Sequence, residues 1–441
     1  MRTGASKKIL LQGCLLLLVK LIVLLLTFTI LMPAISLAIP DLTVHKDRVG
    51  TAPLSADTVS PDESPEEYPY IFVHGFLGNG ESDNPEDLLY WGGSEESNLL
   101  THLREEGKTV YAPSVGTCSS AWDRACELYA QLTGTVVDYG AAHAEDCHHS
   151  RYGRDYTGRA LMGESWDLTQ KLNLVGHSFG GQTIRVFTSL LAYGADEEVA
   201  ATGEDTSPLF EGGHDNAVHA VITLSSPHNG TILSNFGNDL FWPVYAMGLG
   251  MNIAAKDSGS ADYTGTDYGL DQWGLTAEPG SNEAVSIHLL KPWRIVFSKD
   301  NAGYDMGIDG ARALNEKFPT VPTVYYLSYT ADASDLDNAG GFQMTSNILQ
   351  HSKGLIFDGV RIKEGWLAND GLVPTKSALY PLTDEENHAD YQKGQDLKPG
   401  VWYTMPVLTG THLYYCSPQD GDTAAYFAFY DNLTTVVDSM V

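Results

Sequence analysis

The sequence predicts an α/β fold in which a mostly parallel central sheet carries helices on both faces. Short apolar runs, typical of buried strands, alternate along the chain with longer segments that have helical periodicity. The strand-like runs occupy residues 70–73, 110–112, 172–175, 218–224 and 324–329. Strands that are separated by helices pair in parallel through crossover connections, and this arrangement defines the fold class.

Residues 1–38 are typical of a cleaved secretory signal. Basic residues precede an apolar stretch at 21–32, which is followed by small residues up to Ala38. We therefore expect cleavage after Ala38 and a secreted protein. The less favoured alternative is an uncleaved membrane anchor over residues 9–32, in which Lys20 would lie at high energetic cost near the bilayer centre.

Residues 39–67 are rich in Pro, Ser, Asp and Glu, and we expect a flexible acidic leader there. The α/β domain is expected over residues 68–441. Within it, the segment from 230 to about 268 combines an apolar stretch with Gly- and Ser-rich sequence. The pattern alone favours an inserted helix pair buried in the core, and the alternative is a mobile lid over a lipid-binding cleft.

The composition limits the partners of the chain. Its formal net charge is −30, and it becomes −34 once the four basic residues of the first 38 are removed. Such a surface repels nucleic acids and anionic membranes, so neither is an expected partner. Only four cysteines follow the predicted signal, which excludes a disulfide-rich scaffold.

Ser178 stands in a Gly-x-Ser-x-Gly motif between Gly176 and Gly180. The apolar run 172–175 precedes the motif and a helix-like run, 182–193, follows it. This order of strand, sharp turn, serine and helix is the nucleophile elbow of α/β-hydrolases. The helix N-terminus favours negative charge that develops nearby, so we interpret Ser178 as a nucleophile.

A serine nucleophile needs a base and a residue that orients the base, and α/β-hydrolases supply them in the order Ser, Asp or Glu, His. Asp370 lies in a polar Asn-Asp-Gly turn, and His412 follows in Gly-Thr-His. We predict that Asp370 orients the imidazole of His412, which deprotonates Ser178. Spacing alone supports these assignments weakly, because His412 is one of 14 histidines.

An oxyanion hole requires two backbone N–H groups that point at one position. We assign one to Phe179, directly after the nucleophile, and the other to Phe76, in the His-Gly-Phe segment after the first strand. Gly75 allows the loop to bend. His74 is expected to be a packing residue rather than a catalytic one.

A second group of residues is typical of a metal site. Asp123 precedes His143 by twenty residues, and Cys147, His148 and His149 follow closely. Two imidazoles with carboxylates suit zinc, which usually takes four ligands. The alternative is a set of solvated loop histidines, which the residues alone do not exclude.

Eight segments carry a resemblance to a known family. They are His74-Gly75-Phe76, Tyr90-Trp91-Gly92-Gly93, the W-D-R-A-C-E run at 122–127, V-D-Y-G-A-A-H at 137–143, R-Y-G-R at 151–154, S-P-L-F-E-G-G at 207–213, S-P-H-N-G-T at 226–231 and L-D-Q-W-G-L at 270–275. Together they resemble the secreted bacterial triacylglycerol lipases typified by the staphylococcal and thermophilic bacillus enzymes. The resemblance covers most of residues 68–430.

The resemblance implies hydrolysis of acylglycerols at oil–water interfaces, with a lid that opens there. It implies the triad and oxyanion residues already assigned. It also implies a structural zinc ion, whose ligands fall on Asp123, His143, His149 and Asp271. The assignment of His149 competes with its neighbour His148.

Two positions depart from the pattern of these lipases. Phe179 replaces the usual Gln after the nucleophile, which keeps the backbone donor but makes the pocket more apolar. In the bacillus branch a calcium ligand lies two residues after the catalytic histidine, and that position is Tyr414 here. A calcium site is therefore doubtful, with Asp420 as a remaining candidate ligand.

Three other functions fit the same residues less well. A phospholipase or a short-chain carboxylesterase would use the same machinery, since acyl length and headgroup are set by the shape of the pocket and the lid. A non-catalytic protein that binds lipids or a partner at a surface is a remote third alternative.

Overall fold

The computed structural model describes residues 68–81, 89–235, 269–274, 295, 298–334, 336, 351–354, 356–357 and 360–440. The predicted signal (1–38), the predicted leader (39–67) and residues 236–268 of the predicted lid lie outside these ranges.

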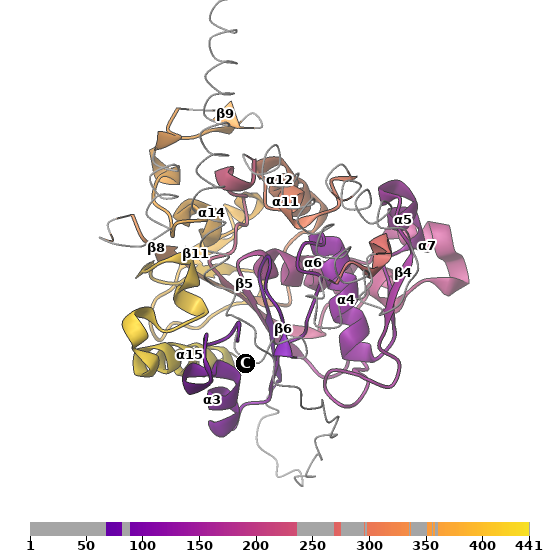
Figure 1. The fold of residues 1–441 in the computed structure, drawn as a ribbon, viewed down its shortest axis with the longest axis horizontal. Helices are drawn as coiled ribbons and strands as arrows, with labels where there is room; N and C mark the ends of the chain where they lie inside the picture. Colours follow the sequence, from indigo (N-terminus) through magenta and orange to yellow (C-terminus); the bar gives the residue numbers. More distant parts are fainter. Residues whose placement is uncertain are drawn as a thin grey trace, which may run out of the picture. The chain divides into compact units, whose positions relative to one another are not determined.

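Seven strands form one sheet, which is drawn in Figure 1. They are β1 (Tyr70–Val73), β2 (Val110–Tyr111), β5 (Leu172–His177), β6 (Val218–Leu224), β7 (Tyr325–Tyr329), β11 (His388–Asp390) and β12 (Trp402–Thr404). Their order is β11-β12-β7-β6-β5-β1-β2, and every pairing within the sheet is parallel. The prediction of a mostly parallel α/β sheet is confirmed.

The two strands at one edge, β11 and β12, were not predicted. The reason lies in their length and composition, because each has three residues and β11 reads His388-Ala389-Asp390. Three further pairs lie outside the main sheet. They are β3 (Val136–Asp138) with β4 (Tyr152–Asp155), β8 (Ala331–Asp332) with β13 (Leu408–Thr409), and β9 (Ile356–Phe357) with β10 (Val360–Arg361).

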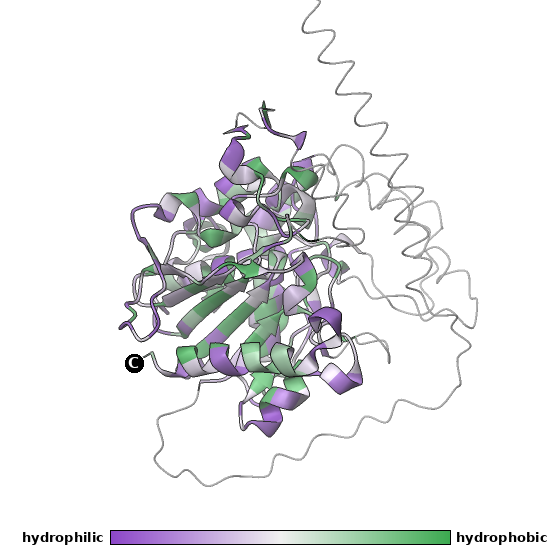
Figure 2. Cartoon of the chain, turned by 90° about the vertical axis from the view of Figure 1, so that its left-hand side faces the viewer, coloured by the Kyte–Doolittle hydropathy of each residue, from purple (hydrophilic) through white to green (hydrophobic). Residues whose placement is uncertain are grey.

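Helices cover both faces of the sheet, and Figure 2 shows the apolar strands as a layer between them. Strand side chains alternate between the faces. In β1, Ile71 and Val73 join a core with helices α4 (Ala121–Thr133) and α6 (Phe179–Tyr193). Tyr70 and Phe72 join a second core with α3 (Leu99–Glu105) and α15 (Thr423–Asp438). This period of two is what a strand buried on both faces requires.

The remaining helical elements connect the strands at the sheet's ends. The α-helices are α5 (Ala141–Cys147), α7 (Asp196–Thr202), α8 (Pro208–Glu211), α11 (Ala302–Asp305), α12 (Ile308–Lys317) and α14 (Thr375–Leu379). The 3₁₀-helices are η3 (Glu95–Ser97), η4 (Gly203–Asp205), η5 (Asp271–Trp273), η6 (Glu364–Trp366), η7 (Leu382–Asp384), η8 (His412–Tyr415) and η9 (Gln419–Gly421). In the part of the chain that the structure describes, no helix combines the length and the apolar character needed to span a bilayer.

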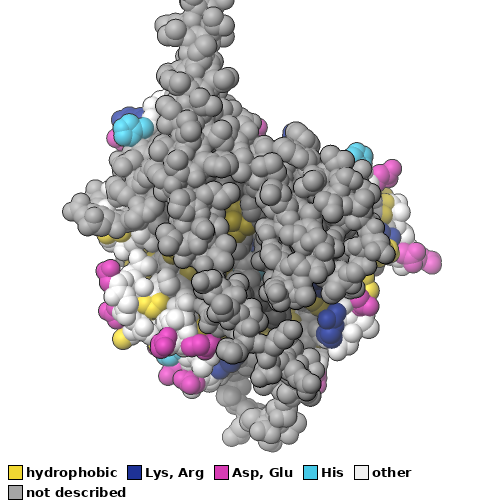
Figure 3. All heavy atoms as spheres, in the orientation of Figure 1, with side chains coloured by type: hydrophobic (Ala, Val, Ile, Leu, Met, Phe, Trp, Pro, Cys, Tyr) yellow, Lys and Arg dark blue, Asp and Glu magenta, His cyan; other side chains and the backbone are white. Residues whose placement is uncertain are grey.

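The acidic composition is visible at the surface. On the face shown in Figure 3, Asp and Glu side chains (magenta) lie around the rim of the molecule, and Lys and Arg (dark blue) are interspersed among them. The charge therefore belongs to the folded domain as well as to the leader.

The packing of α6 against β1 depends on a missing side chain at Gly180. A Cβ atom there would overlap the Val73 carbonyl oxygen and lie 2.7 Å from the His74 carbonyl oxygen. We expect Gly180→Ala to lower the free energy of unfolding by about 1–3 kcal/mol, because backbone atoms cannot move aside as side chains do. Urea denaturation measures the change.

Gly365→Ala is the matched control, because a Cβ atom there meets only the Lys376 side chain, at 3.7 Å. Its effect should stay within about 0.5 kcal/mol. Equal losses in the two variants would contradict the close approach of α6 to β1.

Candidate functional site

Ser178 lies in a strained turn between β5 and α6. Its φ of 55° and ψ of −126° are values that a non-glycine residue rarely adopts. Two backbone hydrogen bonds hold the turn: the Ser178 N–H donates to the Leu224 carbonyl at 2.8 Å, and the Gly181 N–H donates to the Ser178 carbonyl at 3.1 Å. The surrounding structure thus fixes the serine in the geometry of a nucleophile elbow.

Glycines make this turn possible and bring a second loop against it. A Cβ atom on Gly176 would lie 2.5 Å from the carbonyl carbon of Gly180, where β5 and α6 approach each other. A Cβ atom on Gly75 would lie 2.8 Å from the Cβ of Ser178. The loop from His74 to Gly78, which we call the oxyanion loop, therefore contacts the serine directly.

Asp370 and His412 form a buried hydrogen-bonded pair. The Nδ1–H of His412 donates to Asp370 Oδ2 at 2.7 Å, and the His412 backbone N–H donates to the Asp370 carbonyl at 2.8 Å. The N–H groups of Leu372 and Val373 donate to Asp370 Oδ1 at 2.9 and 2.7 Å. With its proton on Nδ1, His412 keeps the lone pair of Nε2, which a general base requires.

The pKa of Asp370 is lowered from its ordinary value. Burial opposes ionisation, but the adjacent His412 and the N–H groups of Val373 and Leu372 stabilise the carboxylate by more. Asp370 is therefore ionised at neutral pH and can stabilise positive charge on the imidazole.

His177, directly before Ser178, holds the His412 backbone against the elbow. Its Nε2–H donates to the His412 carbonyl at 2.9 Å, and the two imidazole rings lie 4.8 Å apart between centroids. The structure thus brings the segments of the predicted triad residues, Ser178, Asp370 and His412, to one place. His177 is a residue that the sequence analysis did not single out.

The oxyanion loop is held in a defined orientation by His74. The Nδ1–H of His74 donates to the Gly75 carbonyl at 2.8 Å, and its Nε2 accepts from the Val115 N–H at 3.2 Å. Because a trans peptide is planar, anchoring the Gly75 carbonyl points the Phe76 N–H in the opposite direction. Burial and the nearby Arg124 lower the pKa of His74 to about 3, so the ring stays neutral.

Arg124, on α4, contacts both elements that carry the predicted oxyanion donors. One Nη2 hydrogen bond goes to the His74 carbonyl, and the guanidinium carbon lies 4.8 Å from the centroid of the Phe179 ring. Burial lowers the pKa of Arg124 to about 10, which leaves it charged at neutral pH. A buried cation of this kind was not foreseen from the sequence.

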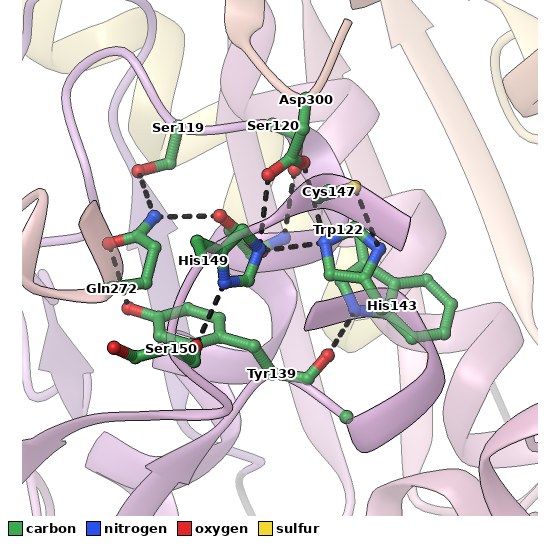
Figure 4. Close-up of polar contacts among 12 residues, drawn as sticks. Ser119, Ser120, Trp122, Tyr139, His143, Cys147, His149, Ser150, Gln272 and Asp300 are labelled. Carbon is green, nitrogen blue, oxygen red and sulfur yellow. Dashed lines mark hydrogen bonds and ion pairs between the residues drawn. The ribbon is translucent and has the colours of Figure 1, made fainter. Parts of the chain in front are cut away.

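Figure 4 shows a group of potential metal ligands contributed by α4, α5 and the segment before α11. His143 Nε2 lies 3.1 Å from Asp123 Oδ1 and 3.4 Å from Asp300 Oδ1. His149 Nε2 lies 3.2 Å from Asp300 Oδ2 and 3.8 Å from Asp123 Oδ1. His149 Nε2 and Asp300 Oδ2 are both buried and face each other across this 3.2 Å contact. Two imidazole nitrogens and two carboxylates that converge in this way fit a metal ion.

The choice between His148 and His149 follows from the end of α5. His148 adopts a left-handed conformation (φ 64°) just after the helix and is exposed, whereas the His149 side chain is fully buried. Cys147 lies beside the same cluster, with its Sγ 3.9 Å from His143 Nδ1. His143, Cys147, His149 and Asp300 each place one potential ligand atom within 4.8 Å of the others.

The assignment of Asp271 as a metal ligand stays a prediction, and the geometry at this residue does not favour it. Its carboxylate forms a two-point ion pair with Arg154, at 2.9 and 3.3 Å. The next residue, Gln272, points toward the cluster instead and donates to Asp123 Oδ2 at 2.6 Å. The segment that contains Asp271 therefore contacts the cluster through Gln272, and Asp300 is the second carboxylate that lies beside both imidazoles.

Asp300 was missed because no local pattern marks it. It lies 151 residues after His149, in a polar segment without histidine or cysteine. Only the approach of the chain before α11 to the N-terminus of α4 brings it to the cluster, where the Ala302 N–H donates to the Cys118 carbonyl at 2.9 Å.

The region of the doubtful calcium site has no grouping of ligands in the part of the chain described. Tyr414, at the position of the family's carboxylate, belongs to η8, and Asp420 is exposed in η9. Neither belongs to the metal-ligating group found among the described residues. A calcium site therefore stays doubtful, as the sequence analysis left it.

Comparison with known proteins assigns the chain to a family. A profile described as "Lipase-like, C-terminal domain" matches residues 66–432. The chain belongs to this lipase-like family. Lipase 2 of Staphylococcus aureus is 36% identical over 374 residues, which are 81% of this chain and 51% of that protein. This chain thus spans about half the length of the curated relatives it matches.

Solved structures agree with the family. The crystal structure of the Staphylococcus hyicus lipase has a TM-score of 0.71 and 30% identity, over 87% of this chain and 99% of that one. Lipase 1 from Pelosinus fermentans has a TM-score of 0.70 and 33% identity, over 85% of this chain and 99% of that one. The resemblance to staphylococcal lipases and the α/β-hydrolase fold are confirmed.

Substitutions at Asp300 and at Asp271 should have different effects on metal binding by this lipase-like protein. We expect Asp300→Asn to weaken Zn²⁺ binding by about 100-fold or more, because it removes a proposed ligand. Structural zinc sites require their full set of ligands. Asp271→Asn should leave binding strong, because it removes only a partner of Arg154. Titration calorimetry with Zn²⁺ measures both, and the reverse ranking would restore Asp271.

The Asp370–His412 pair predicts a pH-dependent contribution to stability. The folded-state pKa of Asp370 lies below its unfolded value of about 3.9, so folding favours the ionised form. This contribution is fully present above about pH 4 and is lost as the pH falls through the folded-state pKa. The gap in unfolding free energy between wild type and Asp370→Asn should therefore shrink from pH 7 to pH 3, in urea denaturation at each pH. A gap independent of pH would contradict the stabilisation of the Asp370 carboxylate by the fold.

Proposed function

We propose that this protein is a secreted serine hydrolase that cleaves the carboxylic ester bonds of acylglycerols. The observation that carries the proposal is the buried Asp370–His412 pair, held by His177 against the strained elbow at Ser178. An imidazole with its proton directed at a carboxylate is chemically suited to take a proton from a serine hydroxyl. The family membership supports the same reaction.

In the proposed reaction, Ser178 Oγ attacks the ester carbonyl while His412 Nε2 takes the hydroxyl proton. Asp370 stabilises the resulting imidazolium through the Nδ1 hydrogen bond. The N–H groups of Phe76 and Phe179 donate to the tetrahedral oxyanion. His412 then gives its proton to the leaving alcohol, and a water molecule, activated by the same imidazole, hydrolyses the acyl-enzyme.

Acylglycerols are the favoured substrates for two reasons. The relatives with the same architecture are named lipases. In addition, the apolar stretch within residues 230–268 suits a lid that opens at a lipid surface. Phe179 adds no support, because its side chain is fully buried against Arg124. A phospholipase and a short-chain carboxylesterase remain the alternatives, because both would use the same three residues.

Zinc is the metal proposed for the cluster of Asp123, His143, His149 and Asp300. Two imidazoles and two carboxylates form a ligand set that zinc accepts, and four protein ligands leave no open position for substrate. The ion would act by joining α4, α5 and the chain before α11, and it would take no part in the chemical step.

The secreted location and the lid at residues 230 to about 268 are part of the proposal. Both rest on the sequence: the first on residues 1–38, the second on the apolar stretch and on the resemblance to interfacially active lipases.

Hydrolysis of emulsified long-chain triacylglycerol, compared with a soluble short-chain ester, tests the function. We expect the wild type to cleave both and to prefer the emulsion. Ser178→Ala should lose about 10⁴-fold or more in kcat, since removing a triad member leaves only a small residual rate. Ser189→Ala, on the same helix and also buried, is the matched control and should keep activity.

The other outcomes separate the alternatives. Activity confined to the soluble ester would make the protein a carboxylesterase without a working lid. Activity on phospholipid alone would favour the phospholipase. An inactive wild type, tested with Zn²⁺ present, would favour the non-catalytic lipid-binding protein.

A further inference from the structure

A chain of hydrogen bonds joins the oxyanion loop to the catalytic base through two residues outside the triad. The Gly75 N–H donates to Tyr90 Oη at 2.7 Å, and Tyr90 Oη lies 2.6 Å from His177 Nδ1. His177 Nε2 lies 2.9 Å from the His412 carbonyl oxygen. We propose that Tyr90 and His177 are positioning residues that fasten the oxyanion loop to the segment of the catalytic base.

The direction of every bond in this chain is determined by its ends. A backbone N–H can only donate, so Tyr90 Oη accepts from Gly75. A carbonyl can only accept, so His177 carries its proton on Nε2 and leaves Nδ1 as an acceptor. The Tyr90 hydroxyl must therefore donate to His177 Nδ1. All three bonds are satisfied at once, with one proton in each.

Burial keeps both side chains in the protonation states that these bonds need. Burial and the nearby His412 lower the pKa of His177 to about 3, so the ring is neutral at any pH at which a serine esterase works. Burial raises the pKa of Tyr90 well above its ordinary value, so the hydroxyl keeps its proton. Tyr90 and His177 are thus both neutral, and the chain of hydrogen bonds through them carries no charge.

The chain of hydrogen bonds lies next to each of the three proposed catalytic groups along the backbone. Gly75 precedes Phe76, the proposed oxyanion donor, and His177 precedes Ser178, the proposed nucleophile. The last bond ends on His412, the proposed base. Its action rests on the proposed function: it holds the distance between base, nucleophile and oxyanion donor before substrate binds. Groups held in advance stabilise developing charge without reorganisation.

Cys416 allows the effect of Tyr90 on the oxyanion loop to be separated from its effect on the His177 ring. Its Sγ lies 3.2 Å from His177 Nδ1, so a thiol proton is available to that nitrogen if the Tyr90 hydroxyl is removed. Among the described residues, Tyr90 is the acceptor for the Gly75 N–H, and no second acceptor lies beside it. Tyr90→Phe should therefore release mainly the oxyanion loop and leave the ring of His177 in place.

Steady-state kinetics of Tyr90→Phe on a soluble short-chain ester test the proposal. We expect kcat to fall about 10- to 100-fold with little change in KM, since a displaced oxyanion donor weakens only transition-state binding. Inactivation of Ser178 by a p-nitrophenyl alkylphosphonate should slow by a similar factor, because its phosphoryl oxygen needs the same donors. Amide hydrogen exchange at Gly75 should become faster.

Tyr326→Phe is the matched control. The Tyr326 hydroxyl is also buried and also accepts a backbone N–H, that of Val321 at 2.9 Å, but it lies in the core with α4 and α6. It should lower the thermal unfolding temperature about as much as Tyr90→Phe does, with kcat unchanged.

Two results would overturn the assignment while leaving the proposed function intact. One is an active wild type whose kcat and phosphonate inactivation survive Tyr90→Phe. The other is an equal loss of kcat in both variants, which would make the effect a general one of stability. A wild type that neither hydrolyses ester nor reacts with the phosphonate would instead overturn the proposed function, and this assignment with it.

Discussion

The left-handed turn at Ser178 is the constraint on which the site depends. A non-glycine residue at φ 55° and ψ −126° costs about 1–3 kcal/mol, and it persists only where neighbouring structure enforces it. Here β5 and α6 are both buried, and they approach each other and β1 so closely that a Cβ atom at Gly176 or Gly180 would overlap backbone atoms. This close approach keeps the turn at Ser178 tight. The free energy gained by burying these two elements offsets the strain at one residue.

Helix α4 connects the metal cluster to the catalytic site through two adjacent residues. Asp123 faces His143 and His149, whereas Arg124 reaches the His74 carbonyl and the Phe179 ring. Side chains at neighbouring helix positions point about 100° apart, so a single helix can serve two sites. A structural metal ion at Asp123 would therefore fix the same helix that supports the oxyanion loop.

The sequence predicted best what depends on local pattern. The strands at 70–73 and 218–224 were placed to the residue, because long apolar runs are unambiguous, and the elbow motif located the turn at Ser178. The short edge strands β11 and β12 lack such a pattern. Asp300 could not be predicted either, since it reaches the cluster only through the packing of the chain before α11 against α4.

The role given to His74 was also incomplete for a physical reason. The sequence indicated a packing histidine, and its burial agrees with that expectation. What the pattern could not show is that both ring nitrogens are engaged, one with the carbonyl of Gly75 and one with the N–H of Val115. The second of these bonds joins residues 41 positions apart in the sequence, so only the fold specifies it.

Three buried histidines meet at this site, and their partners decide what each can do. The N–H groups of His74 and His177 donate to backbone carbonyls, and the other nitrogen of each ring accepts a hydrogen bond. Taking up a further proton would break an accepted bond and place a charge in a buried position without a carboxylate bonded to the ring. His412 alone among the three donates to a carboxylate, that of Asp370, which stabilises the imidazolium as it forms. Since burial is common to all three, the bonded carboxylate distinguishes the proposed base from the two rings that hold the backbone.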